Sequence, residues 1–231
     1  MNAAADAGRA ELVAWFAAAT GYRFTDPASL ELAVVHRSAG RNNNERLEFL
    51  GDAVLDTVIS HRLLSLRPQA SEGELSRLRS VLVREQTLAA VAADLDVAAR
   101  LELGPGERKS GGHRRASILA DALEALLGAV FLDGGYPAAE LVIDHLFATR
   151  LLQLPSDAEL KDPKTRLQEW LQQRAEALPE YRVIDVRGAA HQQAFTVVCT
   201  LPAQGLEFRA TGSSRRKAEQ IAAADALAAL E

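Results

Sequence analysis

Residues 44–52 read NERLEFLGD and contain three acidic side chains, Glu45, Glu48 and Asp52, at positions i, i+3 and i+7. A helix turns by about 100° per residue, so this spacing places all three carboxylates on one helical face. The opposite face has the apolar rhythm of a core helix, formed by Leu47, Leu50, Val54 and Val58. The stretch therefore predicts a core helix with an acidic stripe.

A second acidic pair, Asp121 and Glu124, shares one helical face farther along the chain. The buried side of that helix is predicted to consist of Leu119, Leu123, Leu126 and Leu127. Two such helices can pack so that their carboxylates converge, which is unfavourable unless a cation neutralises them. Because oxygen-only ligands suit Mg²⁺ or Mn²⁺, the pattern favours metal-assisted hydrolysis of a phosphodiester.

Spacing alone leaves a plainer alternative open. Acidic residues three apart are common on solvated helix faces, and Glu45 lies in a first turn, where the helix dipole favours acids. Spacing also leaves Asp56 open as a member of the stripe, because it follows Asp52 by four residues on the same face.

The composition sets broad limits on the class of protein. The chain has 231 residues, 48% of them apolar, which is enough for one large domain or two modest ones. Its net charge of −5 does not exclude a nucleic-acid partner, because residues 1–160 carry −6 and residues 161–231 carry +1. The single cysteine, Cys199, excludes an intramolecular disulfide and is predicted to be a small core residue. With no secretory signal and no long apolar run, a soluble cytoplasmic protein is expected.

The chain divides into two differently patterned parts. Residues 9–151 are predicted to form an all-α domain, followed by a polar linker at residues 152–161. The helix boundaries predicted for the all-α domain are a cap at Asp26-Pro27, a capping box at Ser71 and Glu74, and a stop at Gly134-Gly135 for a helix that begins near Ser117.

Residues 162–231 are predicted to form a small α+β domain of order α-β-β-β-α. Asp162-Pro163 caps a helix, and period-two alternation then predicts strands at 181–186, 195–201 and 206–210. An alanine-rich helix is expected from about residue 214 to residue 230. At its start lie Arg215, Arg216 and Lys217, which together with the helix dipole make an anion site, although a solvated basic turn is the plain alternative.

The first domain has a basic segment of its own, residues 104–115, which feeds into the helix bearing Asp121 and Glu124. Its four cations, Lys109 among them, lie among glycines that we expect to be flexible. Such a segment can hold RNA phosphates near the acidic residues, and a plain surface loop is the alternative.

Residues 44–52 and the run DALE at 121–124 resemble the two acidic motifs of the ribonuclease III family. The nine-residue match is contiguous and therefore specific. The resemblance implies that Glu48, Asp121 and Glu124 are Mg²⁺ ligands and that Asp52 and Glu124 are most closely tied to the chemical step. It also implies that Glu45 organises the site through hydrogen bonds.

The C-terminal pattern resembles a double-stranded RNA-binding domain, in which the first helix and the first inter-strand loop contact successive minor grooves. The resemblance assigns the first role to Thr165, Gln168 and Glu169, and the loop role to His191. It assigns the phosphates between the grooves to Arg215, Arg216 and Lys217. One departure is Ala189, where many such domains have proline, and this leaves the rigidity of the loop open.

Together the resemblances cover the chain from about residue 10 and leave Asp56 outside the acidic set. They imply a Mg²⁺-dependent endoribonuclease, with Mn²⁺ as a substitute ion, that processes ribosomal RNA precursors and other structured transcripts. The family works as a homodimer on double-stranded RNA and leaves a 5′-phosphate, a 3′-hydroxyl and a short 3′ overhang. No membrane and no small-molecule cofactor are expected.

Two rival interpretations remain. A non-catalytic double-stranded RNA-binding regulator would not need the acidic set. A metal-dependent phosphohydrolase acting on small molecules would not need the C-terminal domain.

Overall fold

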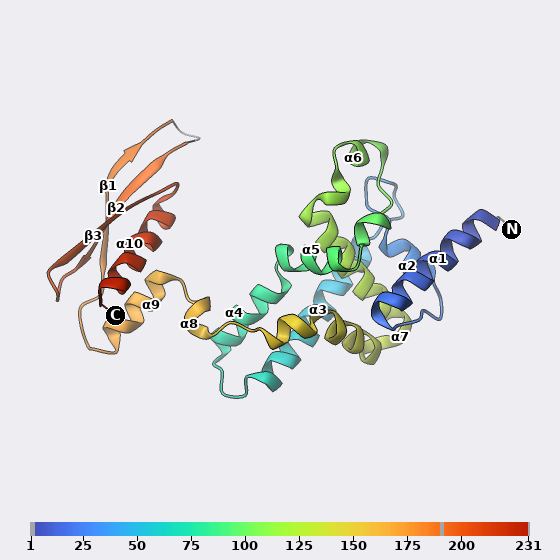
Figure 1. Cartoon of the computed structure of the whole chain (residues 1–231), viewed down its shortest axis with the longest axis horizontal. Helices are drawn as coiled ribbons and strands as arrows, with labels where there is room; N and C mark the ends of the chain where they lie inside the picture. The colour runs from blue at the N-terminus through green and yellow to red at the C-terminus, as the bar shows by residue number, and fades with distance from the viewer. Residues whose placement is uncertain (1–2, 190–191, 231) are drawn as a thin grey trace. The chain divides into compact units, whose positions relative to one another are not determined.

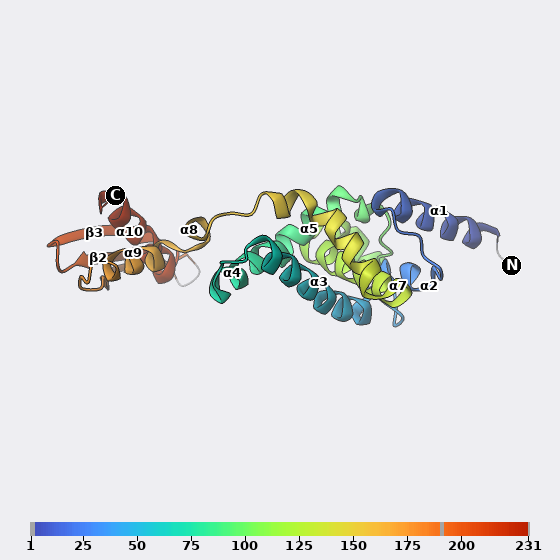
Figure 2. The same ribbon diagram turned by 90° about the horizontal axis from the view of Figure 1, so that it is seen from below.

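The computed structural model describes residues 3–189 and 192–230 and separates into two compact units, 1–154 and 155–231. The first unit is helical and the second combines a small sheet with helices, as Figures 1 and 2 show. The two-part fold class expected from the sequence is confirmed. In the described ranges, no helix is long and apolar enough to cross a membrane.

The first unit is built almost wholly from helices. In chain order they are α1 (Ala3–Thr20), α2 (Ala28–Ala33), α3 (Glu45–Leu66), α4 (Glu72–Val83), α5 (Glu85–Asp94), the 3-10 turn η1 (Val97–Ala99), α6 (Pro105–Lys109), the 3-10 turn η2 (Gly112–Arg114) and α7 (Ala116–Leu152). One isolated bridge between Val35 and Glu102 adds a short parallel contact that the helical pattern did not predict.

Helices α3 and α7 form the centre of this unit. The predicted core side of α3 is buried at Leu47, Val54 and Val58, whereas Leu50 is only half-buried. The difference arises because the buried face extends toward Leu55, which is fully buried, so that Leu50 lies at its margin. Burial of this apolar face against α7 is what fixes the direction of the acidic stripe.

The predicted helix boundaries are met with one small shift. The Ser71 side chain accepts the Glu74 N–H, as a cap requires. Gly135 breaks the long helix α7 with φ 69° and ψ −169°, a conformation that favours glycine. Pro27 is the N-cap of α2 rather than its first helical residue, although the Asp26 side chain accepts the N–H of Ala28 as a capping side chain does.

The second unit places two helices on one antiparallel sheet. Its elements are α8 (Asp157–Leu160), α9 (Pro163–Gln172), β1 (Glu180–Arg187), β2 (Ala194–Leu201), β3 (Leu206–Gly212) and α10 (Arg215–Leu230), and the strand order is β1-β2-β3. The turn α8 lies inside the segment predicted as a linker. Leu167 and Leu171 of α9 pack with Cys199 of β2 and Ala222 of α10 in one core, so Cys199 is a buried core residue as predicted.

Candidate metal centre and nucleic-acid interface

The two acidic helices bring three carboxylates together. Glu48 of α3 and Asp121 and Glu124 of α7 each offer a carboxylate oxygen, and the three oxygens lie within 4.8 Å of one another. All three side chains are half-buried, so each remains open to solvent on one side. The convergence expected from the spacing of the two motifs is therefore present.

Two glycines permit this convergence. A Cβ atom on Gly51 of α3 would lie 1.8 Å from the backbone oxygen of Glu124, and one on Gly128 of α7 would lie 2.2 Å from the backbone oxygen of Leu47. Real Cβ atoms essentially never approach backbone so closely, hence α3 and α7 touch along a line of missing side chains. Sequence reasoning missed this role, although glycines inside two apolar helices are its signal.

The electrostatics of the cluster reflect its crowding. Burial, followed by the neighbouring carboxylates of Asp52 and Glu48, raises the pKa of Glu124 to about 8. Burial and then Asp121 raise the pKa of Glu48. Burial also raises the pKa of Asp121, and His36 and Arg37 oppose that rise. Ionising all three carboxylates therefore costs free energy unless a cation neutralises them.

The remaining acidic residues lie around the cluster and not within it. Asp52 is exposed, and among the neighbouring carboxylates it raises the pKa of Glu124 most. Glu45 is exposed and pairs with Arg37, with 3.8 Å between Nη1 and Oε1. Asp56 faces Arg79 at 3.9 Å and adds a weaker charge effect on Glu124. Arg37 is a cation beside the site that the sequence did not reveal.

The donor set fits a hard divalent cation. Three carboxylate oxygens close together and open to water match the all-oxygen, partly hydrated coordination that Mg²⁺ and Mn²⁺ prefer. No nitrogen or sulfur donor joins them in the described residues, which disfavours a softer metal.

The basic segment 104–115 is partly helical. It contains the helix α6 and the turn η2, with Lys109 exposed at the end of α6. The carboxylate of Glu107 pairs with Arg115 at 3.1 Å and accepts the Ser110 hydroxyl at 3.2 Å. The Glu107 carboxylate thus connects α6 to the residue that follows η2, while the flexibility of the segment stays a prediction.

In the second unit, α9 presents the side chains that we assigned to RNA. The Thr165 hydroxyl donates to Asp162 Oδ2 at 3.1 Å, Gln168 is exposed, and Glu169 pairs with Lys161 at 2.7 Å. Thr165 and Glu169 are thus already engaged within the fold, whereas Gln168 projects into solvent.

The cations at the start of α10 lie beside this surface. Arg215, Arg216 and Lys217 are all exposed. Thr165, Gln168 and Arg216 line a common cavity of about 550 Å³, so the structure brings the two helix starts together. His191 lies outside the described residues.

Comparison with known proteins identifies both units. The Ribonuclease-III-like family matches residues 26–151, and the double-stranded RNA binding motif matches residues 163–230. The chain belongs to the ribonuclease III family. As a member it is an endoribonuclease that acts on double-stranded RNA, and the family is metal-dependent.

Several relatives span nearly the whole of this ribonuclease III chain. Ribonuclease 3 of Nitrosococcus oceani is 55% identical over 212 residues, which are 91% of this chain and 91% of the relative. Ribonuclease 3 of Alkalilimnicola ehrlichii is 53% identical over 211 residues, 91% and 92% of the two chains. The solved nuclease domain of ribonuclease III from Campylobacter jejuni has a TM-score of 0.56 at 38% identity and covers 61% of this chain and 96% of its own.

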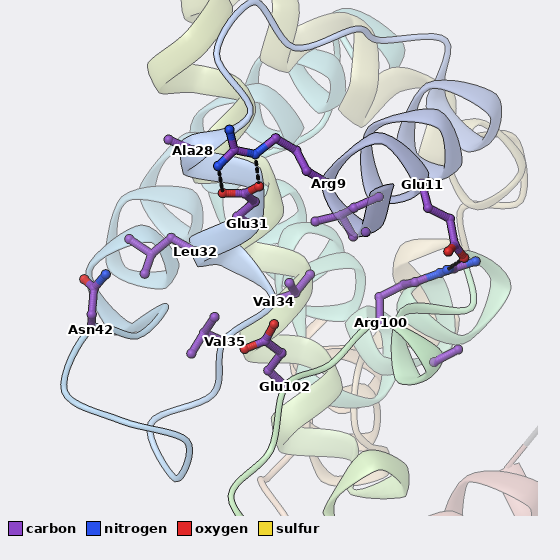
Figure 3. Close-up of a pocket in the computed structure, with 13 residues that line it drawn as sticks. Arg9, Glu11, Ala28, Glu31, Leu32, Val34, Val35, Asn42, Arg100 and Glu102 are labelled. Atoms are coloured by element: carbon purple, nitrogen blue, oxygen red, sulfur yellow. Dashed lines mark hydrogen bonds and ion pairs between the residues drawn. The ribbon is translucent and has the colours of Figure 1, made fainter. Parts of the chain in front are cut away.

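The nuclease unit of this ribonuclease III chain also has a hollow of about 710 Å³ between α1, α2 and the segment 99–102. Figure 3 shows Arg9 reaching from α1 to Glu31 of α2, and Arg100 pairing with Glu11. None of the clustered carboxylates belongs to its lining among the residues that the structure describes. This hollow is therefore separate from the candidate metal site formed by the acidic cluster.

Proposed function

We propose that the chain is a Mg²⁺-dependent endoribonuclease in which the acidic cluster holds the ion, with Mn²⁺ as a substitute. The convergence of Glu48, Asp121 and Glu124 within 4.8 Å is the observation that carries this proposal. When bound, such an ion lowers the pKa of water and stabilises charge on the attacking and leaving oxygens of a phosphodiester.

The protein side chains then divide the work. Glu48, Asp121 and Glu124 hold the ion once they are deprotonated, and the ion then offsets the burial that raises the pKa of all three and the carboxylate repulsion that adds to it at Glu48 and Glu124. Asp52, exposed beside Glu124, acts with Glu124 in the chemical step. Glu45 keeps the rim of the site ordered through Arg37.

The RNA is held by residues of both units. Lys109 of the nuclease unit binds phosphates near the cluster. In the second unit, Gln168, Thr165 and Glu169 contact one minor groove and His191 the next, while Arg215, Arg216 and Lys217 bind the phosphates between them. Recognition follows A-form shape, with little reading of bases.

The active form is a homodimer in which two acidic sites face one duplex and each cuts one strand. Two exposed apolar side chains support this proposal, because a partner subunit could cover them. Phe49, within the acidic motif, is 80% exposed, and Leu141 of α7 is 72% exposed. The Campylobacter jejuni structure is described as showing flexibility in a region involved in dimer formation. The products are a 5′-phosphate, a 3′-hydroxyl and a short 3′ overhang, and the substrates include ribosomal RNA precursors and other structured transcripts.

The main rival is a regulator that binds double-stranded RNA without cutting it. Glu124→Ala removes one ligand of the cluster and leaves the second unit untouched. We expect cleavage of a labelled RNA duplex in Mg²⁺ to be lost, by about 10³-fold or more. Duplex binding should remain nearly unchanged.

Glu102→Ala is the matched control, because Glu102 is an exposed carboxylate outside the cluster, and its activity should equal that of the wild type. If Glu124→Ala cut the duplex as fast as this control, the metal-centred mechanism would be wrong. If the wild type bound duplex RNA but cut none, the regulator would take its place.

A further inference from the structure

A carboxylate lies in the middle of the basic surface of the second unit. Glu219 is on α10, one turn after Arg215, and its side chain is only 10% exposed. Its two oxygens have separate partners: Oε2 accepts from Lys164 Nζ at 2.6 Å, and Oε1 accepts from Arg215 Nε at 2.7 Å. A carboxylate buried so deeply is stable because both oxygens are hydrogen-bonded to cations.

The presence of this carboxylate is unexpected on charge alone. Every negative group beside a phosphate-binding surface weakens phosphate binding. Glu219 lines the same cavity as Arg216, Thr165 and Gln168, which are assigned to RNA. An uncharged residue at this position would leave the surface more positive, so the benefit of Glu219 must come from geometry.

The contacts of Glu219 and of its neighbour Gln220 fasten the starts of two helices together. Lys164, whose ammonium group is held by Glu219, lies 4.3 Å from the centre of the Tyr181 ring. The backbone N–H of Lys164 donates to Gln220 Oε1 at 3.1 Å, and Gln220 Nε2 donates to Asp162 Oδ1 at 2.8 Å. The first turn of α9 and the second turn of α10 are thereby joined by hydrogen bonds to side chains.

The groups that meet RNA lie in these two turns or in the turns next to them. Thr165 and Gln168 project from α9, and Arg215 and Arg216 from α10. Arg215 is 64% exposed, and its Nε atom is held by Glu219. An arginine restrained through one edge of its guanidinium loses less side-chain entropy on binding a phosphate than a free one does.

We propose that Glu219 is a positioning residue for double-stranded RNA binding: it holds Arg215 and Lys164, and with them the starts of α9 and α10, in the arrangement that receives the RNA backbone. This rests on the proposed RNA-binding role of Arg215 and its neighbours. Glu219 itself does not touch RNA; it acts through the two cations.

The test uses a variant for which charge and positioning predict opposite results. Glu219→Gln removes one negative charge, so charge alone predicts tighter duplex binding. Positioning predicts weaker binding, by about five- to tenfold at physiological salt. The slope of log K against the logarithm of the salt concentration should also become shallower by about one, because Arg215 no longer makes its phosphate contact.

Binding is measured with the full chain carrying Glu124→Ala, so that RNA is not cut, by titrating a fluorescent RNA duplex at several salt concentrations. Glu207→Gln is the charge-matched control, since Glu207 is exposed on β3, and it should bind as tightly as the parent or slightly more tightly. With Glu124 intact, Glu219→Gln should raise KM for cleavage and leave kcat unchanged.

A double-mutant cycle separates positioning from a loss of folding. In a chain that already carries Arg215→Gln, the further change Glu219→Gln should weaken binding less than it does alone, by about two- to threefold, because Lys164 is then the only one of the two cations left for it to position. Tighter or equal binding by Glu219→Gln alone would overturn the inference. So would a five- to tenfold loss that persists in full with Arg215→Gln.

These outcomes are distinct from failure of the proposed function. That failure would appear as a parent chain that does not bind duplex RNA, or whose affinity does not respond to Arg215→Gln.

Discussion

Glu124 of the nuclease unit and Glu219 of the RNA-binding unit are both helix carboxylates partly withdrawn from water, yet their surroundings are opposite. Glu124 faces other carboxylates, and burial together with these neighbours raises its pKa to about 8. At Glu219, burial favours the neutral form, but hydrogen bonds from Lys164 and Arg215 outweigh it and lower the pKa. One carboxylate still needs a cation, and the other already has two.

The difference shows how each charge is held in place. Opposite charges at Glu219 attract, so a single helical turn and one neighbouring helix suffice. The like charges around Glu124 repel, so the backbone must hold them together, and the contact of Gly51 with the Glu124 backbone does so. The packing of α3 on α7 therefore supplies the energy that keeps the acidic cluster assembled.

The largest expected effect comes from Gly51→Ala. The new Cβ would meet the Glu124 backbone oxygen at 1.8 Å, so α3 and α7 must separate. We expect the nuclease unit to lose about 3 kcal/mol of stability, together with its cleavage activity, because overpacking and loss of the cluster act together. Urea unfolding followed by the fluorescence of Trp15, in a chain with Trp170→Phe, measures this unit alone.

Gly8→Ala is the control for this substitution. Gly8 is also inside a helix, but no atom lies within 4 Å of the added Cβ, so alanine should leave stability unchanged or raise it by up to about 1 kcal/mol. If Gly51→Ala behaved like Gly8→Ala, the packing of the two helices would not hold the cluster together.

A smaller effect is expected from pH at Glu124 in metal-free protein. The folded-state pKa of about 8 lies above the ordinary value of 4.5, so the unfolded chain ionises first and stability falls as pH rises between these values. Because Glu124 retains contact with solvent, we expect a loss of about 1–2 kcal/mol. Glu124→Gln lacks this loss, so the free energy of unfolding of the variant, relative to that of the wild type, should increase from pH 5 to pH 9.

Added Mg²⁺ should reverse the loss of stability at high pH in the wild type but not in Glu124→Gln. Ion binding requires the deprotonated carboxylates, so Mg²⁺ should raise the melting temperature more at pH 8 than at pH 6. It should raise that of Glu124→Gln little at either pH. A constant difference between the two proteins from pH 5 to pH 9 would mean that Glu124 does not carry the raised pKa.

Much of this architecture could be predicted from the sequence, and the failures have physical causes. The acidic stripe, the second acidic pair and the α-β-β-β-α order follow from periodicity, which is a local property. The contact of Gly51 with α7 is not local, since it depends on which helix packs against which face. The sequence pattern assigned no role to Glu107 or Glu219, and only their partners in the fold reveal that each connects neighbouring basic residues.

The smallest expected effect is the pH dependence of Glu219, and its sign is opposite to that of Glu124. Its folded pKa is lowered, so its contribution is fully present above the ordinary value of 4.5 and is lost as pH falls through the folded pKa. We expect about 1 kcal/mol, since Lys164 and Arg215 are themselves partly exposed. Fluorescence of Trp170, in a chain with Trp15→Phe, reports the unfolding of this unit.

Glu219→Gln should accordingly be less stable than the wild type at pH 7 and equal to it at a pH below the folded pKa. Glu207→Gln, which removes an exposed carboxylate, should differ little from the wild type at either pH. If the deficit of Glu219→Gln were instead the same at both pH values, lost packing would explain it. The contrast between a carboxylate that awaits its cation and one that already has two would then rest on Glu124 alone.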